Sequence, residues 1–127
     1  MVRILIIDDN LIIRHMLKMH IELAPDLEVV GEYEICSHAV DLVSKYKPDV
    51  VVVDFDMLGL AGRKVVEELH QAAPGFPVIA TSLNDGEMNV IVSKEAGAVD
   101  YVVKQADSVA LIKAIRQAIA PSRPDQA

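Results

Sequence analysis

Acidic side chains follow two of the most apolar stretches of this 127-residue sequence. Asp8 and Asp9 follow the run VRILII, while Asp54 closes the run DVVVVD and Asp56 stands just past it. Carboxylates that lie close together repel one another unless a cation joins them. An all-oxygen ligand set suits a hard ion such as Mg²⁺, and a carboxylate beside Mg²⁺ can attack a phosphoryl group. These residue types therefore indicate metal and phosphoryl chemistry, provided that the fold brings the two runs together.

Polar groups also end two later apolar stretches. Thr81 and Ser82 follow PVIA, and Lys104 follows VDYVV. A lysine and a serine near a phosphoryl group would contact its oxygens. The plainer interpretation is that an Asp after a strand only forms a turn or caps a helix, and Asp9 or Asn10 could do no more than that. The joint pattern is more specific, because independent caps have no reason to bring a lysine and a serine to the same place.

Short apolar stretches alternate with longer amphipathic ones along the chain. Strands are predicted at residues 2–7, 27–35, 49–54, 77–81 and 99–103, and helices at 11–24, 37–47, 62–73, 85–96 and after 107. The predicted caps are Asn10, Gly97 and Asp107. Five βα units with short connections predict an α/β fold, a parallel sheet with helices on both faces. Functional groups of such a sheet lie beyond the carboxyl ends of its strands, where all the polar groups above are expected.

Composition narrows the class of protein. The length predicts one domain, residues 1–120, followed by a linker or loose tail at 121–127. The formal net charge of -7 argues against direct nucleic-acid binding, and the apolar runs are too short to cross a membrane. The single cysteine, Cys36, favours a reducing, cytoplasmic location.

Four motifs and their spacings resemble the receiver domain of two-component response regulators: LIIDDN, VVVVDFDMLGLAG, FPVIATS and EAGAVDYVVK. The resemblance covers about Arg3 to Ala120, and residues 24–34 are similar to receivers that carry a helix-turn-helix output domain. It implies a doubly wound, flavodoxin-like sheet of five strands in the order 2-1-3-4-5. It also implies Mg²⁺ or Mn²⁺ as cofactor, a sensor histidine kinase or phosphotransfer protein as partner, and no turnover of a separate substrate.

The resemblance assigns a role to each polar group. Asp54 matches the phosphoacceptor. Asp8 and Asp9 match the metal-binding acidic pair, with Asp9 the direct ligand and Asp8 acting more through water. Asp56 matches the position whose backbone carbonyl completes the metal site and whose side chain tunes dephosphorylation.

Three further positions match the switch. Ser82 matches the hydroxyl residue that moves to meet the phosphoryl group, and it fits better than Thr81 by its distance from Pro77 and Gly97. Lys104 matches the phosphate-contacting lysine, and Tyr101 matches the aromatic residue that turns inward when the hydroxyl residue shifts.

The sequence departs from the family at three places. Leu58 and Ala61 stand where the acceptor loop usually has Pro and Asp, so that loop is expected to be looser or its partner docking altered. Gln105 replaces a usual cis proline. A cis bond before a non-proline costs about 2.5–4 kcal/mol, so a trans bond with a shifted Lys104 is the alternative.

Two other classes of protein compete with the receiver. DFDMLG also resembles the DxD motif of haloacid-dehalogenase-type phosphatases, with Asp54 as nucleophile and Asp56 as general acid and base. In those enzymes, however, the DxD motif ends the first strand, whereas here the DD pair comes first. The other competitor is a purely structural interaction module, which would bind no Mg²⁺.

The receiver interpretation predicts a phosphorylation-dependent surface between the fourth helix, the fifth strand and the last helix, most simply a homodimer. Val90 and Ile112 are expected on helix faces that point away from the sheet. The alternatives are that neighbouring side chains bury both residues, or that two copies pair through the first and last helices.

Overall fold

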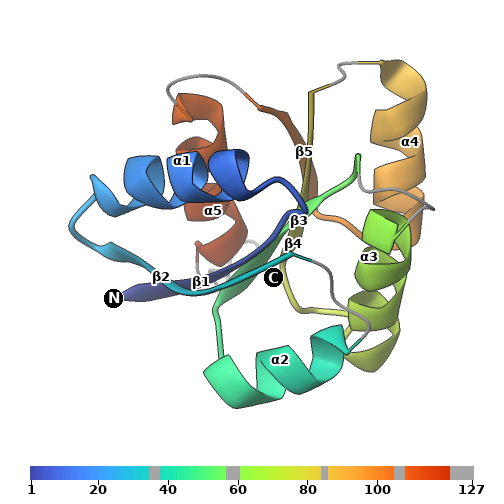
Figure 1. The fold of residues 1–127 in the computed structure, drawn as a ribbon. Helices are drawn as coiled ribbons and strands as arrows, with labels where there is room; N and C mark the ends of the chain where they lie inside the picture. Colours follow the sequence, from blue (N-terminus) through green and yellow to red (C-terminus); the bar gives the residue numbers. More distant parts are fainter. Residues whose placement is uncertain (35–37, 57–60, 84–85, 105–107, 121–127) are drawn as a thin grey trace.

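The computed structural model describes residues 1–34, 38–56, 61–83, 86–104 and 108–120 (Figure 1). The strands are β1 (Val2–Ile7), β2 (Leu27–Tyr33), β3 (Val50–Asp54), β4 (Val78–Ser82) and β5 (Asp100–Val103). The helices are α1 (Leu11–Glu22), α2 (Ala39–Tyr46), α3 (Ala61–Ala72), α4 (Glu87–Ala96) and α5 (Val109–Ile119). The predictions for Cys36, Leu58, Gln105, Asp107 and residues 121–127 lie outside the described residues.

All strand pairings in the sheet are parallel. The strand order is β2-β1-β3-β4-β5, which confirms the predicted topology. In the central pairs, Ile7 lies opposite Val53 and Asp54 lies opposite Thr81. This register brings the carboxyl ends of β1, β3 and β4 level with one another, so the residues that follow β1 lie next to those that end β3.

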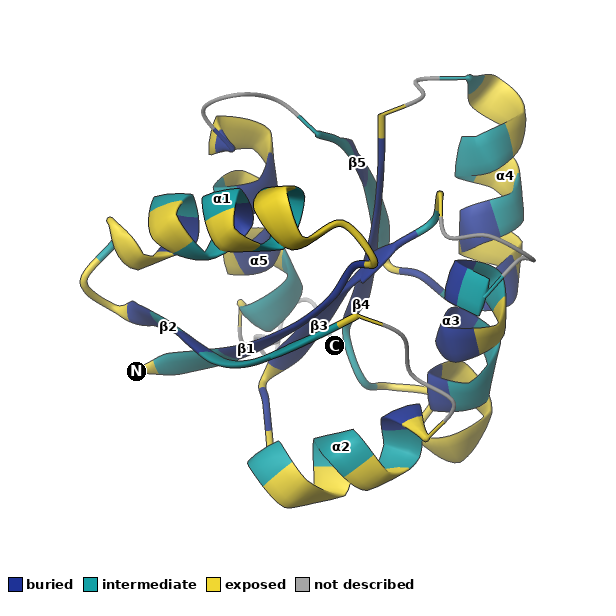
Figure 2. Cartoon of the chain, in the orientation of Figure 1, coloured by how far each residue is buried: buried dark blue, intermediate teal, exposed yellow. Residues whose placement is uncertain are grey.

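Helices cover both faces of the sheet (Figure 1). α1 and α5 bury residues such as Leu17 and Ile115 against one face, and α2, α3 and α4 bury residues such as Val66 and Ala96 against the other. The central strands β3 and β4 are buried at every position, and Figure 2 shows this dark core between helices that are exposed on their outer sides. Val and Ile runs without polar alternation form such strands because both faces are covered. No described helix is long and apolar enough to cross a membrane.

The helix ends test the predicted caps. Asn10 is the N-cap of α1, and its side chain accepts a hydrogen bond from Ile13 N at 3.0 Å, as predicted. Gly97 caps α4 at φ +121°, a left-handed conformation that L side chains rarely adopt, also as predicted. At the start of α5 the N-cap position belongs to Ser108, whose hydroxyl contacts His20 Nδ1 at 3.0 Å rather than a helix N–H.

Candidate functional site

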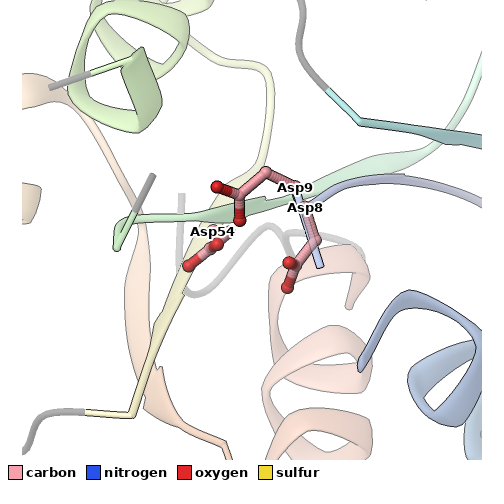
Figure 3. A group of neighbouring side chains, drawn as sticks. All are labelled: Asp8, Asp9 and Asp54. Carbon is pink, nitrogen blue, oxygen red and sulfur yellow. The ribbon is translucent and has the colours of Figure 1, made fainter. Parts of the chain in front are cut away.

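Three carboxylates meet beyond the carboxyl ends of β1 and β3. Asp8 and Asp9 directly follow β1, Asp54 ends β3, and the two strands are neighbours in the sheet. One oxygen from each carboxylate lies within 4.8 Å of the others, and Figure 3 shows the three side chains converging. Asp8 and Asp54 are buried, whereas Asp9 is exposed to solvent. The sheet therefore brings together the two acidic runs that the sequence separates by more than forty residues.

Lys104 lies between the two buried carboxylates. Its Nζ donates to Asp54 Oδ1 at 2.9 Å and forms an ion pair with Asp8 Oδ2 at 3.0 Å. Its side chain is only 3% exposed. Burial by itself lowers the pKa of an ammonium, but the contacts with Asp54 and Asp8 outweigh that effect and raise the pKa of Lys104. The lysine is therefore charged at neutral pH, and it neutralises part of the acidic cluster.

Both carboxyls of the acidic pair, Asp8 and Asp9, have raised pKa values. Burial raises the pKa of Asp8, although the hydrogen bond from Asn10 N and the ion pair with Lys104 act in the opposite direction. Desolvation and then the adjacent Asp54 raise the pKa of Asp9. Within the described residues, Asp8 Oδ2 is buried and has no aligned hydrogen-bond donor. A raised pKa means that ionisation is costly, and a divalent cation would remove that cost, so these residues fit a hard metal ion.

Asp56 is oriented differently from the other three acids. Its backbone N donates to Asp54 Oδ1 at 2.9 Å, but its carboxylate turns towards β4. There it accepts hydrogen bonds from Ser82 Oγ at 2.6 Å and from Leu83 N at 2.8 Å. Only the backbone of Asp56 therefore adjoins Asp54, and its side chain holds the Ser82 hydroxyl.

The remaining predicted residues occupy the adjoining strands. Ser82 is fully buried at the end of β4, and its carbonyl accepts a hydrogen bond from Lys104 N at 2.7 Å. The Thr81 hydroxyl is directed into the sheet, where Val53 O lies 3.4 Å away. Tyr101 is half-buried in β5 and packs against the core on the α2, α3 and α4 face. Ser82, rather than Thr81, is the hydroxyl residue that Asp56 connects to Asp54.

Sequence reasoning missed two supporting residues. Gly62, in the first turn of α3, lies so close to Asp54 that an added Cβ would stand 2.2 Å from the Asp54 carbonyl oxygen. Arg14, in α1, donates from Nη1 to the Asp8 carbonyl oxygen at 2.7 Å. A glycine at the start of the helix that follows β3 was a signal for such a close approach. Nothing in the sequence tells which surface charge of α1 turns inward.

Val90 and Ile112 were expected on outward helix faces. Both are half-buried, and Ile112 packs against the core that α1 and α5 share. The alternative interpretation, burial by neighbouring side chains, therefore describes Ile112 better. The same part of α5 nevertheless exposes Val109, which is 62% accessible. Val109 and Ile112 line a shallow hollow of about 440 Å³ on this helix.

The fold and the site together define a class, the receiver-type α/β domain, in which carboxylates and a buried lysine gather at one edge of a doubly wound sheet. The family model of the response regulator receiver domain matches residues 4–116, and the chain belongs to that family. The predicted resemblance is confirmed, and neither this match nor the fold supports the haloacid-dehalogenase-type alternative.

Two curated relatives are regulators. The chain is 36% identical over 115 residues to the transcriptional regulatory protein DegU of Brevibacillus brevis, a match that covers 91% of this chain and 49% of DegU. It is 31% identical over 117 residues to the nitrate/nitrite response regulator protein NarL of Escherichia coli K12, covering 92% of this chain and 54% of NarL. The chain thus spans about half the length of these relatives.

Two solved structures are similar over nearly the whole chain. One is the response regulator domain of Thermotoga maritima CheB, with a TM-score of 0.81 and 31% identity, covering 96% of this chain and 98% of that one. The other is a LuxR-family two-component response regulator from Aurantimonas sp. SI85-9A1, with a TM-score of 0.86 and 30% identity, covering 97% and 90%. A transcriptional regulator and a LuxR-family regulator among the relatives agree with the predicted similarity to receivers that carry a DNA-binding output.

Proposed function

We propose that this domain accepts a phosphoryl group on Asp54, with Mg²⁺ or Mn²⁺, and acts as a phosphorylation-dependent switch. The observation that carries the proposal is the contact of Lys104 Nζ with Asp54 Oδ1 at 2.9 Å, inside a group of three carboxylates. Membership of the receiver family supports a sensor histidine kinase or phosphotransfer protein as the donor.

The proposed roles follow from position. An Asp54 oxygen attacks the phosphorus, the new O–P bond forms as the N–P bond of phosphohistidine breaks, and the imidazole nitrogen leaves. Asp9, Asp8 and Asp54 would hold the metal, together with the backbone carbonyl of Asp56. When bound, the metal supplies positive charge against the carboxylates and the phosphoryl oxygens. Lys104 already contacts Asp54 and would contact a phosphoryl oxygen there.

The switch would begin at Ser82. The phosphoryl group adds charge and acceptor oxygens next to the end of β4. Ser82 then donates to a phosphoryl oxygen instead of Asp56, and Tyr101 turns into the space that opens behind it. We infer that the surface of α4, β5 and α5 changes shape as a result and forms a contact, most simply a homodimer, around Val109 and Ile112.

This activity is not enzymatic turnover of a separate substrate, since the domain transfers the phosphoryl group only to itself and to water. The transcriptional regulators among its relatives favour a gene-regulatory output, exerted through another part of the protein. The net charge of -7 favours no direct nucleic-acid binding by this domain. We also propose that the domain is located in the cytoplasm and does not contact a membrane.

Labelling with a radioactive small phosphodonor tests the acceptor. We expect wild type to be labelled with Mg²⁺ or Mn²⁺ and not with EDTA, and Asp54→Asn to lose labelling because an amide is a poor nucleophile. Asp49→Asn is the control, because Asp49 instead accepts from Arg3 N at the opposite end of β3. Undiminished labelling of Asp54→Asn would contradict the assignment. Sustained hydrolysis of a nitrophenyl phosphate would support the phosphatase alternative instead.

A further inference from the structure

Arg14 contacts the backbone of the acidic pair from the neighbouring helix. Its Nη1 donates to the Asp8 carbonyl oxygen at 2.7 Å, and its side chain is only 11% exposed. On the other side of the same residue, Asp8 N donates to the carbonyl oxygen of Tyr33 at 2.9 Å. The backbone of Asp8 is thus held by β2 through its N–H and by α1 through its C=O.

Glu32 neutralises the buried guanidinium. Glu32 Oε1 lies 3.7 Å from Arg14 Nε, and both atoms are buried without a hydrogen-bond partner in the described part of the chain. His15 and Lys18, also on α1, lie 3.7 Å from the same carboxylate. A buried charge is tolerated only when it is paired, so Glu32 keeps Arg14 in place under the acidic pair.

The Asp8 carbonyl belongs to the peptide group that joins Asp8 to Asp9. A peptide group is planar, so a donor that fixes this oxygen also fixes the orientation of the Asp9 N–H and restricts the direction of both side chains. Asp8 points into the buried contact with Lys104, while Asp9 stays exposed and faces Asp54. Rotation of this peptide would separate the two carboxylates from Asp54.

We propose that Arg14 is a positioning residue for the metal site: it orients the Asp8–Asp9 peptide so that both carboxylates converge with Asp54. The proposal rests on the proposed function, because it assumes that these carboxylates bind the cation. Partners that orient metal ligands from behind typically contribute 10–100-fold to metal affinity.

Charge and positioning act in opposite directions here, which makes them separable. A positive guanidinium near the site opposes cation binding, so its charge alone predicts tighter binding when Arg14 is replaced by a neutral residue. Positioning predicts weaker binding for the same change. Arg14→Lys keeps the charge but loses the planar fork that reaches the Asp8 carbonyl and Glu32 together.

Mn²⁺ titration, followed by the electron paramagnetic resonance signal of the free ion, tests the proposal on wild type, Arg14→Lys, Arg14→Gln, Lys18→Gln and Asp9→Asn. We expect Arg14→Lys and Arg14→Gln to bind Mn²⁺ about tenfold more weakly than wild type. Lys18→Gln is the matched control, because Lys18 pairs with the same Glu32 and has no hydrogen bond to Asp8. It should stay within about twofold of wild type. Circular dichroism in EDTA shows whether each variant is folded. If Arg14→Lys does not fold, Mn²⁺ binding by Arg14→Gln alone tests the positioning role.

The outcomes distinguish the positioning role of Arg14 from the existence of the metal site. If Asp9→Asn loses Mn²⁺ binding while both Arg14 variants bind like wild type, the positioning role is wrong and the metal site stands. Tighter binding by Arg14→Gln would show that only charge acts, and would also overturn the proposal. If Asp9→Asn binds Mn²⁺ as wild type does, the metal site itself is wrong, and the proposed function fails together with the role of Arg14.

Discussion

The two sides of the carboxyl edge of the sheet are held in different ways. On the β1 side, buried groups of opposite charge contact one another, with Lys104 between Asp8 and Asp54. On the β4 side, the hydroxyl of buried Ser82 donates to the carboxylate of exposed Asp56. Removing one member of a buried charge pair costs several kcal/mol, whereas a single hydroxyl hydrogen bond contributes only about 1 kcal/mol. The difference would suit the proposed function, in which the groups around Asp54 stay in place while the Ser82 hydroxyl changes its partner.

Removing Lys104 should give the largest effect, because it leaves two buried carboxylates without a positive charge beside them. We expect Lys104→Met to lower the free energy of unfolding of the metal-free protein at neutral pH by roughly 3–5 kcal/mol. The control is Lys113→Met, an exposed lysine of α5 that should change stability little. Urea unfolding with and without Mg²⁺ measures both, and the cation should restore part of the loss.

The pH dependence of this loss sharpens the test. In wild type the pKa of Lys104 is raised above its ordinary value of 10.5, so its stabilising contribution is present throughout the neutral range and is lost only as the pH rises through the raised pKa. In Lys104→Met, Asp8 loses the ammonium that opposes the effect of burial on its pKa, so Asp8 takes up a proton more readily and the deficit should shrink as the pH falls. A deficit independent of pH between 5 and 8 would mean that lost packing, rather than charge, causes it.

Removing the restraint on Ser82 should have a smaller effect. Asp56→Asn weakens the hydrogen bond that holds the Ser82 hydroxyl, so we expect affinity for beryllofluoride with Mg²⁺ to rise about fivefold, or about 1 kcal/mol. Loss of a negative charge near the anion acts in the same direction. The double variant Asp56→Asn with Ser82→Ala separates them, since only the charge effect persists without the hydroxyl. If Asp56→Asn raises the affinity for beryllofluoride equally with and without Ser82→Ala, the hydrogen bond between Asp56 and Ser82 does not restrain anion binding.

The smallest effect on the monomer is expected at the proposed contact surface. Val109→Glu should change the free energy of unfolding by less than about 0.5 kcal/mol, because Val109 is largely exposed. With beryllofluoride and Mg²⁺, sedimentation should show wild type as a dimer and Val109→Glu as a monomer. Ile112→Glu, the more buried change, should also lose stability. A wild type that stays monomeric at high concentration would refute the dimer, and a Val109→Glu dimer would place the contact elsewhere, for example on α1 and α5.

Local signals determined most of the fold. The Val and Ile runs were sufficient to predict buried parallel strands, and the capping roles of Asn10 and Gly97 follow from the chemistry of single residues. The polar groups at the strand ends could be listed from the sequence, because a doubly wound sheet always gathers them at one edge. The predicted boundaries were less accurate: the second strand ends at Tyr33 instead of residue 35, and the fourth continues through Ser82.

Only the tertiary structure decided how the listed groups contact one another. The carboxylate of Asp56 could have joined the acidic cluster, but it caps the end of β4 through Ser82 and Leu83. Arg14 could have been a solvent-exposed charge of α1, yet it lies under Asp8 because Glu32 of the edge strand β2 stands opposite it. Helical and strand periodicity specify which face a residue occupies. Its partner depends on the register and packing of segments that are distant in the sequence, and no local pattern encodes these.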